Sequence, residues 1–157
     1  MFENEPIEKN QPFLKDIKNQ PFVKNIQAIA YKPAILQSDK NNAKTQEIQS
    51  VLVKGVDESF DYSFFKENLI SGRLPNYSKS AGKDEIIISK RIATDLNFKV
   101  GDRVRAFFVK NSPVKRYFKL VGIFETGMED FDKKFIIANI EQIQLLNDWG
   151  IKASINV

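Results

Sequence analysis

The feature that most constrains the fold is a pair of alternating apolar runs in the second half of the chain. The runs are RVRAFFV (residues 103–109) and RYFKLVGIFE (residues 116–125), and only KNSPVK separates them. Successive side chains of a strand point to opposite faces, so Val104, Ala106 and Phe108 share one face of the first run. The pattern predicts a β-hairpin with one buried face and one face in solvent.

The other predicted elements are short strands and helices in mixed order. Apolar runs predict two strands joined by the polar segment SDKNNAKTQ into a long hairpin, and three further strands. These strands cover residues 23–37 and 47–57, and then 85–89, 134–140 and 151–157. Helical spacing predicts helices over residues 12–20, 57–72, 89–96 and 141–149. Because this order has no regular strand–helix–strand rhythm, the predicted fold class is α+β.

Local signals mark several of the predicted ends. Asp61 is the expected N-cap within the predicted helix over residues 57–72, and Gly72 is its expected C-terminal stop. Ser89 is expected to cap the next helix. The segment KVGD (residues 99–102) is expected to form a tight turn that needs its glycine.

The same periodicity predicts the core of the second half of the chain. The expected core residues are Ile87, Ile92, Leu96, Val104, Phe108, Phe118, Leu120, Phe124, Ile136 and Leu145.

The composition removes the groups on which most catalytic and metal sites depend. The 157 residues include no histidine and no cysteine, and the net charge is +4. Without these residues the chain lacks the commonest general base, thiolate zinc ligands and the serine–histidine triad. Neither a phosphate-binding glycine loop nor a GxSxG motif occurs. The sequence therefore predicts a non-catalytic binding or scaffolding domain with no cofactor.

The acidic segment EDFD is a candidate metal site. Glu129, Asp130 and Asp132 could offer oxygen ligands to a hard cation such as calcium. The segment lacks the glycine and the distal glutamate of an EF-hand loop, and Lys133 and Lys134 follow it directly. The interpretation favoured by these neighbours is a solvated turn between two strands, with no metal bound.

The basic run from Lys99 to Lys119 is a second candidate site. Seven cations, Lys99, Arg103, Arg105, Lys110, Lys115, Arg116 and Lys119, accompany a single acid, Asp102. One interpretation is the solvated face of the hairpin, and the other is a surface for phosphates or anionic headgroups. Phe107 and Tyr117 are expected on the outer face, so an OB-like nucleic-acid or lipid-headgroup binder remains an alternative.

A family resemblance lies in the order of several motifs. An acid–aliphatic–serine strand (EIIIS) precedes a short helix and KVGD, and FKLVGIF precedes an aliphatic strand that closes on IEQIQLL. Upstream, GRLP matches a GR-x-P turn. Over residues 12–149 this order resembles the extracytoplasmic domain of permeases that include lipoprotein-releasing (LolC/LolE-type), MacB-like and FtsX-like proteins.

The resemblance implies a two-lobed domain located between two membrane helices of its permease. Residues 1–80 would form an incomplete porter-like lobe, residues 81–150 an inserted β-rich lobe, and residues 151–157 the start of a returning porter strand. The implied location is the periplasmic side of the bacterial inner membrane. The implied function is lipoprotein release toward the outer membrane, and the alternatives are MacB-like efflux and FtsX-like signalling.

The resemblance also implies partners. These are a second permease subunit, a separate cytoplasmic ATPase, lipoprotein cargo and a periplasmic chaperone, with no nucleic acid. In chaperone-recruiting relatives a long hairpin projects at the position where this chain has only KNSPVKR. We therefore expect weak, electrostatic partner contact by this loop, and a monomeric or weakly dimeric isolated domain. The loop residues are Lys110, Asn111, Ser112, Pro113, Val114, Lys115 and Arg116.

Overall fold

Strands dominate the fold and the helices are short, and their mixed order confirms the predicted α+β class. The computed structural model describes residues 7–8, 13–21, 27–38, 47–108, 113–147 and 152–156. The strands are β1 (Ile7–Glu8), β2 (Gln27–Gln37), β3 (Ile48–Val56), β4 (Leu69–Gly72), β5 (Glu85–Ser89), β6 (Arg103–Phe108), β7 (Val114–Phe124), β8 (Phe135–Asn139) and β9 (Lys152–Asn156). The helices are α1 (Phe13–Lys18), α2 (Ser63–Glu67), η1 (a 3₁₀ turn, Ser80–Gly82), α3 (Lys90–Asp95), α4 (Glu129–Lys134) and α5 (Ile140–Asn147).

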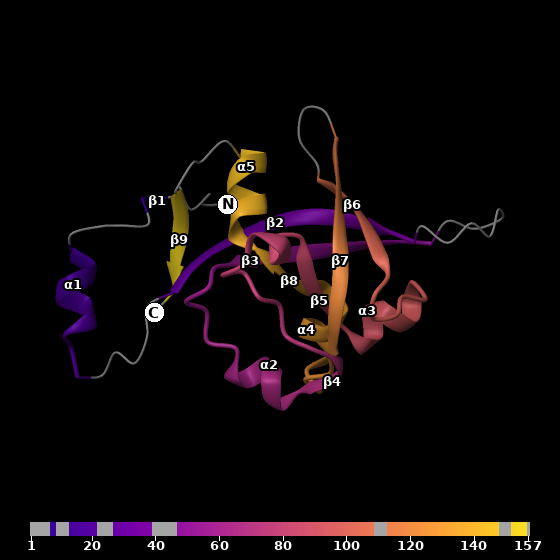
Figure 1. The fold of residues 1–157 in the computed structure, drawn as a ribbon, viewed down its shortest axis with the longest axis horizontal. Coiled ribbons are helices and arrows are strands. Elements are labelled where there is room, and N and C mark those ends of the chain that lie inside the picture. The colour runs from indigo at the N-terminus through magenta and orange to yellow at the C-terminus, as the bar shows by residue number, and fades with distance from the viewer. Residues whose placement is uncertain are drawn as a thin grey trace.

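Within these residues, β2, β3, β8, β5, β7 and β6 pair in that order, and β6 then returns to pair with β2 (Figure 1). The pairing is therefore a closed ring. β3–β8 and β5–β7 are parallel pairs, and the other pairs of the ring are antiparallel. Outside the ring, β9 pairs with the first residues of β2 and with β1, and β4 pairs with the last residues of β7.

The ring encloses one apolar core, and the alternation of β6 shows why it forms. Val104, Ala106 and Phe108 are fully buried, whereas Arg103 is exposed and Arg105 is partly exposed. All six ring strands contribute to this cluster. Helices α3 and α5 add Ile92, Ala93, Ile140, Ile143 and Leu146 to it. The predicted hairpin of β6 and β7 is confirmed, with Val104 opposite Phe118 and Phe108 opposite Val114.

A second apolar cluster lies on the other face of the sheet, and a bulge in β7 brings Phe124 into it. Ile86 pairs with Leu120, but Ile87 pairs with Gly122, so Val121 is the extra residue. Beyond this point the side chains of β7 exchange faces. Phe124 is buried as predicted, but it packs against Phe65 in the second cluster instead of beside Phe108.

Nine of the ten predicted core residues are buried, and Leu145 is the exception. Its exposed fraction is 66%, whereas that of its neighbour Leu146 is 2%. The prediction was wrong by one position because α5 begins at Ile140 and turns Ile143 and Leu146 toward the core.

The predicted helix over residues 57–72 is mostly wrong. Only Ser63–Glu67 is helical, and Leu69–Gly72 instead forms β4 against β7. Asp61 accepts hydrogen bonds from the backbone N–H and hydroxyl of Ser63, but Tyr62 occupies the N-cap position. Long-range pairing with β7 thus overrides the local helical pattern.

The predicted hairpin of residues 23–37 and 47–57 corresponds to β2 and β3, which pair from Ile29–Val56 to Gln37–Ile48. A strand over residues 152–156 also matches the prediction for the end of the chain. Strands on both sides of residue 80 share the ring, since β2 pairs with β6 and β3 with β8. The division into two lobes stays a prediction.

Candidate functional site

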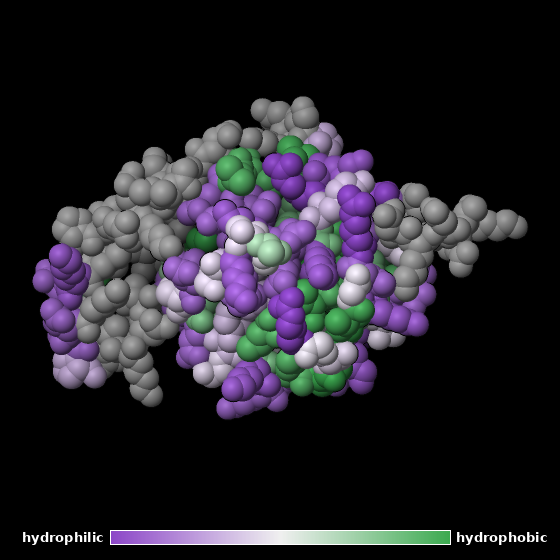
Figure 2. Space-filling model, in the orientation of Figure 1, coloured by the Kyte–Doolittle hydropathy of each residue, from purple (hydrophilic) through white to green (hydrophobic). Residues whose placement is uncertain are grey.

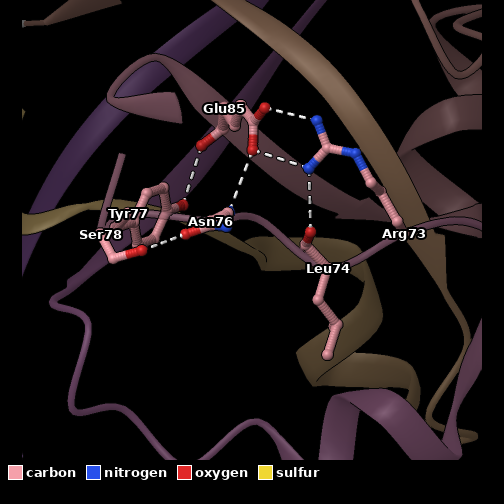
Figure 3. Close-up of polar contacts among 6 residues, drawn as sticks. All are labelled: Arg73, Leu74, Asn76, Tyr77, Ser78 and Glu85. Atoms are coloured by element: carbon pink, nitrogen blue, oxygen red, sulfur yellow. Dashed lines mark hydrogen bonds and ion pairs between the residues drawn. The ribbon is translucent and has the colours of Figure 1, made fainter. Parts of the chain in front are cut away.

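The GR-x-P turn and the acid that opens β5 form one polar cluster (Figure 3). Arg73 donates from Nη2 to Oε1 of Glu85 at 2.5 Å and from Nη1 to Oε2 at 2.9 Å. The backbone N–H of Asn76 donates to the same carboxylate at 3.0 Å, and the Tyr77 hydroxyl donates to the Glu85 carbonyl at 2.8 Å. The cluster fastens the loop after β4 to the start of β5.

The charges of this cluster satisfy one another. The hydrogen bonds from Arg73 lower the pKa of Glu85, and the bond to the Asn76 N–H acts in the same direction. The Glu85 side chain is only 7% exposed, while that of Arg73 is 56% exposed. A buried carboxylate held charged by a bidentate guanidinium positions the loop and is not free to take up a substrate proton.

Two more family motifs also have a structural role. Ser89 accepts a hydrogen bond from the backbone N–H of Ile92, as predicted for the cap of α3, and its hydroxyl donates to the carbonyl of Asp132. In KVGD, Asp102 accepts from the backbone N–H of Lys99 at 2.8 Å, and Gly101 has a φ of +97°. The turn requires glycine there, as predicted.

The EDFD segment is a helix and not a turn, which corrects the prediction. It forms α4, with acids in the first turn and Lys133 and Lys134 in the last. Buried Asp132 accepts from the backbone N–H and the hydroxyl of Thr126, and Glu129 pairs with Lys133 at 2.7 Å. Among the described residues no three acids converge as a metal site would require.

The outer face of the β6–β7 hairpin carries cations around one aromatic ring. Arg103 lies opposite Lys119, and Arg105 lies opposite Tyr117. The Arg103 guanidinium carbon is 3.8 Å from the centre of the Tyr117 ring, and Arg105 and the Lys115 ammonium are at 5.7 and 5.5 Å. On the face shown in Figure 2, hydrophilic side chains lie near the upper part of β7, while apolar ones gather lower down, near β4 and α4.

These cations act on the tyrosine hydroxyl as well as on the ring. A hydrogen bond with Lys115, supported by the charges of Lys115 and Arg105, lowers the pKa of Tyr117. A hollow of about 240 Å³ next to Tyr117 is lined by Arg103, Lys119, Asp84 and Asp102. The hollow thus brings two cations and two acidic residues together beside the Tyr117 ring.

The described part of the predicted partner-contact loop lies beside this face. Lys110, Asn111 and Ser112 lie outside the described residues. Val114, Lys115 and Arg116 belong to β7 and not to a loop, because the hairpin ladder reaches the pair Phe108–Val114. The connection between β6 and β7 therefore contains fewer residues than the predicted loop. Lys115 belongs to the outer face of the hairpin.

A second hollow, of about 450 Å³, lies at the start of α5. It is lined by Asp57, Glu58, Lys83, Asn139, Glu141 and Gln144, among other residues. Lys83 pairs with Glu141 at 3.0 Å, and Asn139 accepts from the Glu141 N–H. Sequence reasoning missed this hollow because its residues come from the segment after β3, from β8 and α5, and from the region before β5.

Sequence reasoning also missed the pairing of Arg73 with Glu85, since nothing local joins two residues on either side of a loop. The cluster around Tyr117, by contrast, can be recognised in the sequence. Strand alternation places Arg103, Arg105, Lys115 and Tyr117 on one face of the hairpin. None of the described helices has the length and apolar character needed to cross a membrane.

Comparison with known proteins places the fold. The crystal structure of the extracellular domain of YknZ, a noncanonic ABC-type transporter from Gram-positive bacteria, superposes with a TM-score of 0.60 at 18% identity, covering 98% of this chain and 72% of that one. The periplasmic region of MacB from Actinobacillus actinomycetemcomitans gives a TM-score of 0.58 at 14% identity, covering 90% of this chain and 59% of that one. No curated protein matches the sequence significantly.

The family comparison covers nearly the whole chain. The model of the MacB-like periplasmic core domain matches residues 5–156, which include all the described strands and helices. The chain therefore belongs to the family of MacB-like periplasmic core domains.

Proposed function

We propose that this chain is the working extracytoplasmic module of a MacB-like ABC-type transporter permease, where it contacts other transporter subunits and cargo without catalysing a reaction. The observation that carries the proposal is the family match over residues 5–156. The matched fold supports it, since both structures described above are extracytoplasmic parts of such transporters.

A non-catalytic role agrees with the chemistry of the described residues. Two of the three acids of EDFD are engaged in local contacts, as the pairs Asp132–Thr126 and Glu129–Lys133 show. The perturbed pair Arg73–Glu85 is a structural clamp. ATP hydrolysis would then belong to a separate cytoplasmic subunit.

The closed ring of strands favours a mechanical role. A ring has no unpaired edge in its interior ladder and encloses one packed core, so it moves as a body. A cytoplasmic motor that displaces such a body transmits the motion to whatever the body contacts outside the membrane.

Lipoprotein release is the cargo function that the ordered motifs favour, with a second permease subunit and lipoprotein cargo as partners. The short connection between β6 and β7 supports a subunit that does not itself recruit a chaperone. MacB-like efflux is the second candidate, favoured by the family match.

The test is co-purification of the intact protein that carries this chain. We expect it to be recovered from the membrane fraction together with an ABC-type ATPase. Recovery in the soluble fraction without an ATPase would contradict the proposal.

Depletion of the intact protein then separates the two cargo functions. Accumulation of lipoproteins in the inner membrane would support release. Unchanged lipoprotein sorting with increased sensitivity to toxic small molecules would instead support efflux.

A further inference from the structure

The outward-facing residues of the β6–β7 hairpin make a surface that the fold itself does not explain. We call it the basic platform, and it consists of Arg103, Arg105, Phe107, Lys115, Tyr117 and Lys119. Neighbouring rows pair Arg103 with Lys119, Arg105 with Tyr117, and Phe107 with Lys115. Each row therefore contains a cation, and one row consists of two.

Facing cations on adjacent strands repel each other, so the platform is unfavourable for the isolated chain. Tyr117 offsets part of this cost, because its ring accepts the Arg103 guanidinium at 3.8 Å. The hydroxyl of Tyr117 engages Lys115, and both Lys115 and Arg105 lower the pKa of this tyrosine. The cations thus converge on one partly exposed polar group.

Several other cations on the described surface are matched by acids. Arg91 pairs with Asp95 at 3.0 Å, and Lys90 pairs with Glu125 at 3.5 Å. Within the part of the chain that the structure describes, no carboxylate lies within ion-pair distance of Arg103 or Lys115. The platform is therefore a local excess of positive charge that an external anion would complete.

The spacing of the rows indicates the form of that anion. Alternate residues on a strand are about 6.6 Å apart, and the same spacing separates alternate side chains of any extended peptide. An extended segment with acids at every second position would place its carboxylates opposite successive rows of the platform. A phosphate on a mobile headgroup would have no such register.

We infer that the basic platform binds an extended acidic segment of a partner protein, with the carboxylates alternating along the segment and Tyr117 as the central contact. The inference deepens the proposed function by stating the chemistry of one partner. It rests on that function for the presence of a partner protein, while the regular spacing of the rows favours an extended peptide over a lipid headgroup.

The experiment uses the 157-residue chain and a labelled synthetic peptide of alternating glutamate and threonine. The test variant combines Arg103→Gln, Lys115→Gln and Lys119→Gln. The matched control combines Lys66→Gln, Lys79→Gln and Lys134→Gln, which removes three exposed cations elsewhere. We expect the test variant to bind the peptide about tenfold more weakly at low salt, and the control to bind as the parent does.

Two further measurements test the contact with Tyr117 and the spacing of the acids along the peptide. Bound carboxylates should raise the pKa of Tyr117 toward its ordinary value, which an ultraviolet titration detects and Tyr117→Phe abolishes. A peptide of equal composition with its glutamates in one block should bind more weakly than the alternating peptide. Equal binding of the two peptides, or equal losses in test and control variants, would refute the inference.

A final experiment measures binding of the chain to vesicles that contain phosphatidylglycerol. If they bind the chain through the platform and the alternating peptide does not, the occupant is a membrane and the inference is wrong. The co-purification described above does not depend on the platform. If the intact protein co-purifies with an ATPase but its basic platform does not bind acidic peptides, this inference is refuted and the proposed function is not.

Discussion

Gly72 and Gly122 lie opposite each other in the β4–β7 ladder, at the point where the two backbones are too close for a side chain. A Cβ on Gly122 would lie 2.3 Å from the Arg73 carbonyl oxygen, and one on Gly72 would lie 2.1 Å from that of Val121. The bulge in β7, the strand β4 and the Arg73 clamp meet at this pair.

Alanine at Gly122 should therefore destabilise the fold by about 3 kcal/mol or more, since backbone must shift to admit the methyl group. Urea denaturation measures the loss. The control is Gly127→Ala, whose φ is +79° but whose Cβ would meet nothing within 4 Å. It should cost only about 1 kcal/mol, and equal losses at the two positions would show that the close approach is not real.

The Arg73–Glu85 clamp should make stability depend on pH in the acidic range. The folded pKa of Glu85 is lowered from its ordinary value near 4.5, so its contribution is present above that value and is lost as the pH falls through the folded pKa. Glu85→Gln should cost about 1–2 kcal/mol at neutral pH, and this cost should shrink as the pH falls below about 4.5. Glu58→Gln is the control, and it should keep the acid-induced loss that Glu85→Gln removes.

The four tyrosines should ionise in a fixed order. The cations of the basic platform lower the pKa of Tyr117, while burial raises the pKa of Tyr31, Tyr62 and Tyr77. Absorbance at alkaline pH should show Tyr117 ionising first, and Tyr117→Phe should remove this step. Because Tyr62 and Tyr77 are held neutral in the fold, stability should decrease as the pH rises above about 10. A single transition of all four tyrosines would contradict the placement.

Substitution of two neighbouring leucines tests which face of α5 packs against the core. Leu146→Ala removes a side chain that is 2% exposed, and should cost about 2–5 kcal/mol. Leu145→Ala removes one that is 66% exposed, and should change stability by less than about 0.5 kcal/mol. Thermal denaturation distinguishes the two, and a reversed order would mean that α5 is rotated by one residue.

Calcium, magnesium and zinc should leave the thermal stability unchanged, because Asp132 and Glu129 in α4 already bond to Thr126 and Lys133. A rise of several degrees with any of these cations would contradict the description of the EDFD segment.

The sequence patterns correctly predicted those elements that are determined by residues close together in the chain. The alternation around Val104 and Phe108 fixes both strands of the hairpin and their buried face, and Ser89 marks the start of α3. The bulge at Val121 was missed, although Gly122 inside a strand is a sign of one. Because a single extra residue exchanges the two faces, the error moved Phe124 to the wrong core while leaving it buried.

The remaining errors have two different origins. EDFD followed by two lysines carries the charge order of a helix, acids first and cations last, and this signal was available. The strand β4 was not predictable in the same way, because Leu69 and Gly72 are extended by their pairing with β7, far along the chain. The clamp between Arg73 and Glu85 exists only once that pairing is formed.

The attachment of β9 to β2 has a mechanical consequence. The pairs Gln27–Asn156, Ala28–Ile155 and Ile29–Ser154 run along the same strand that continues into the ring. A pull directed along β9, away from the ring, therefore loads these pairs in shear, so that they resist together instead of opening one after another. Tension applied at β9 is therefore transmitted through β2 to the whole ring of strands.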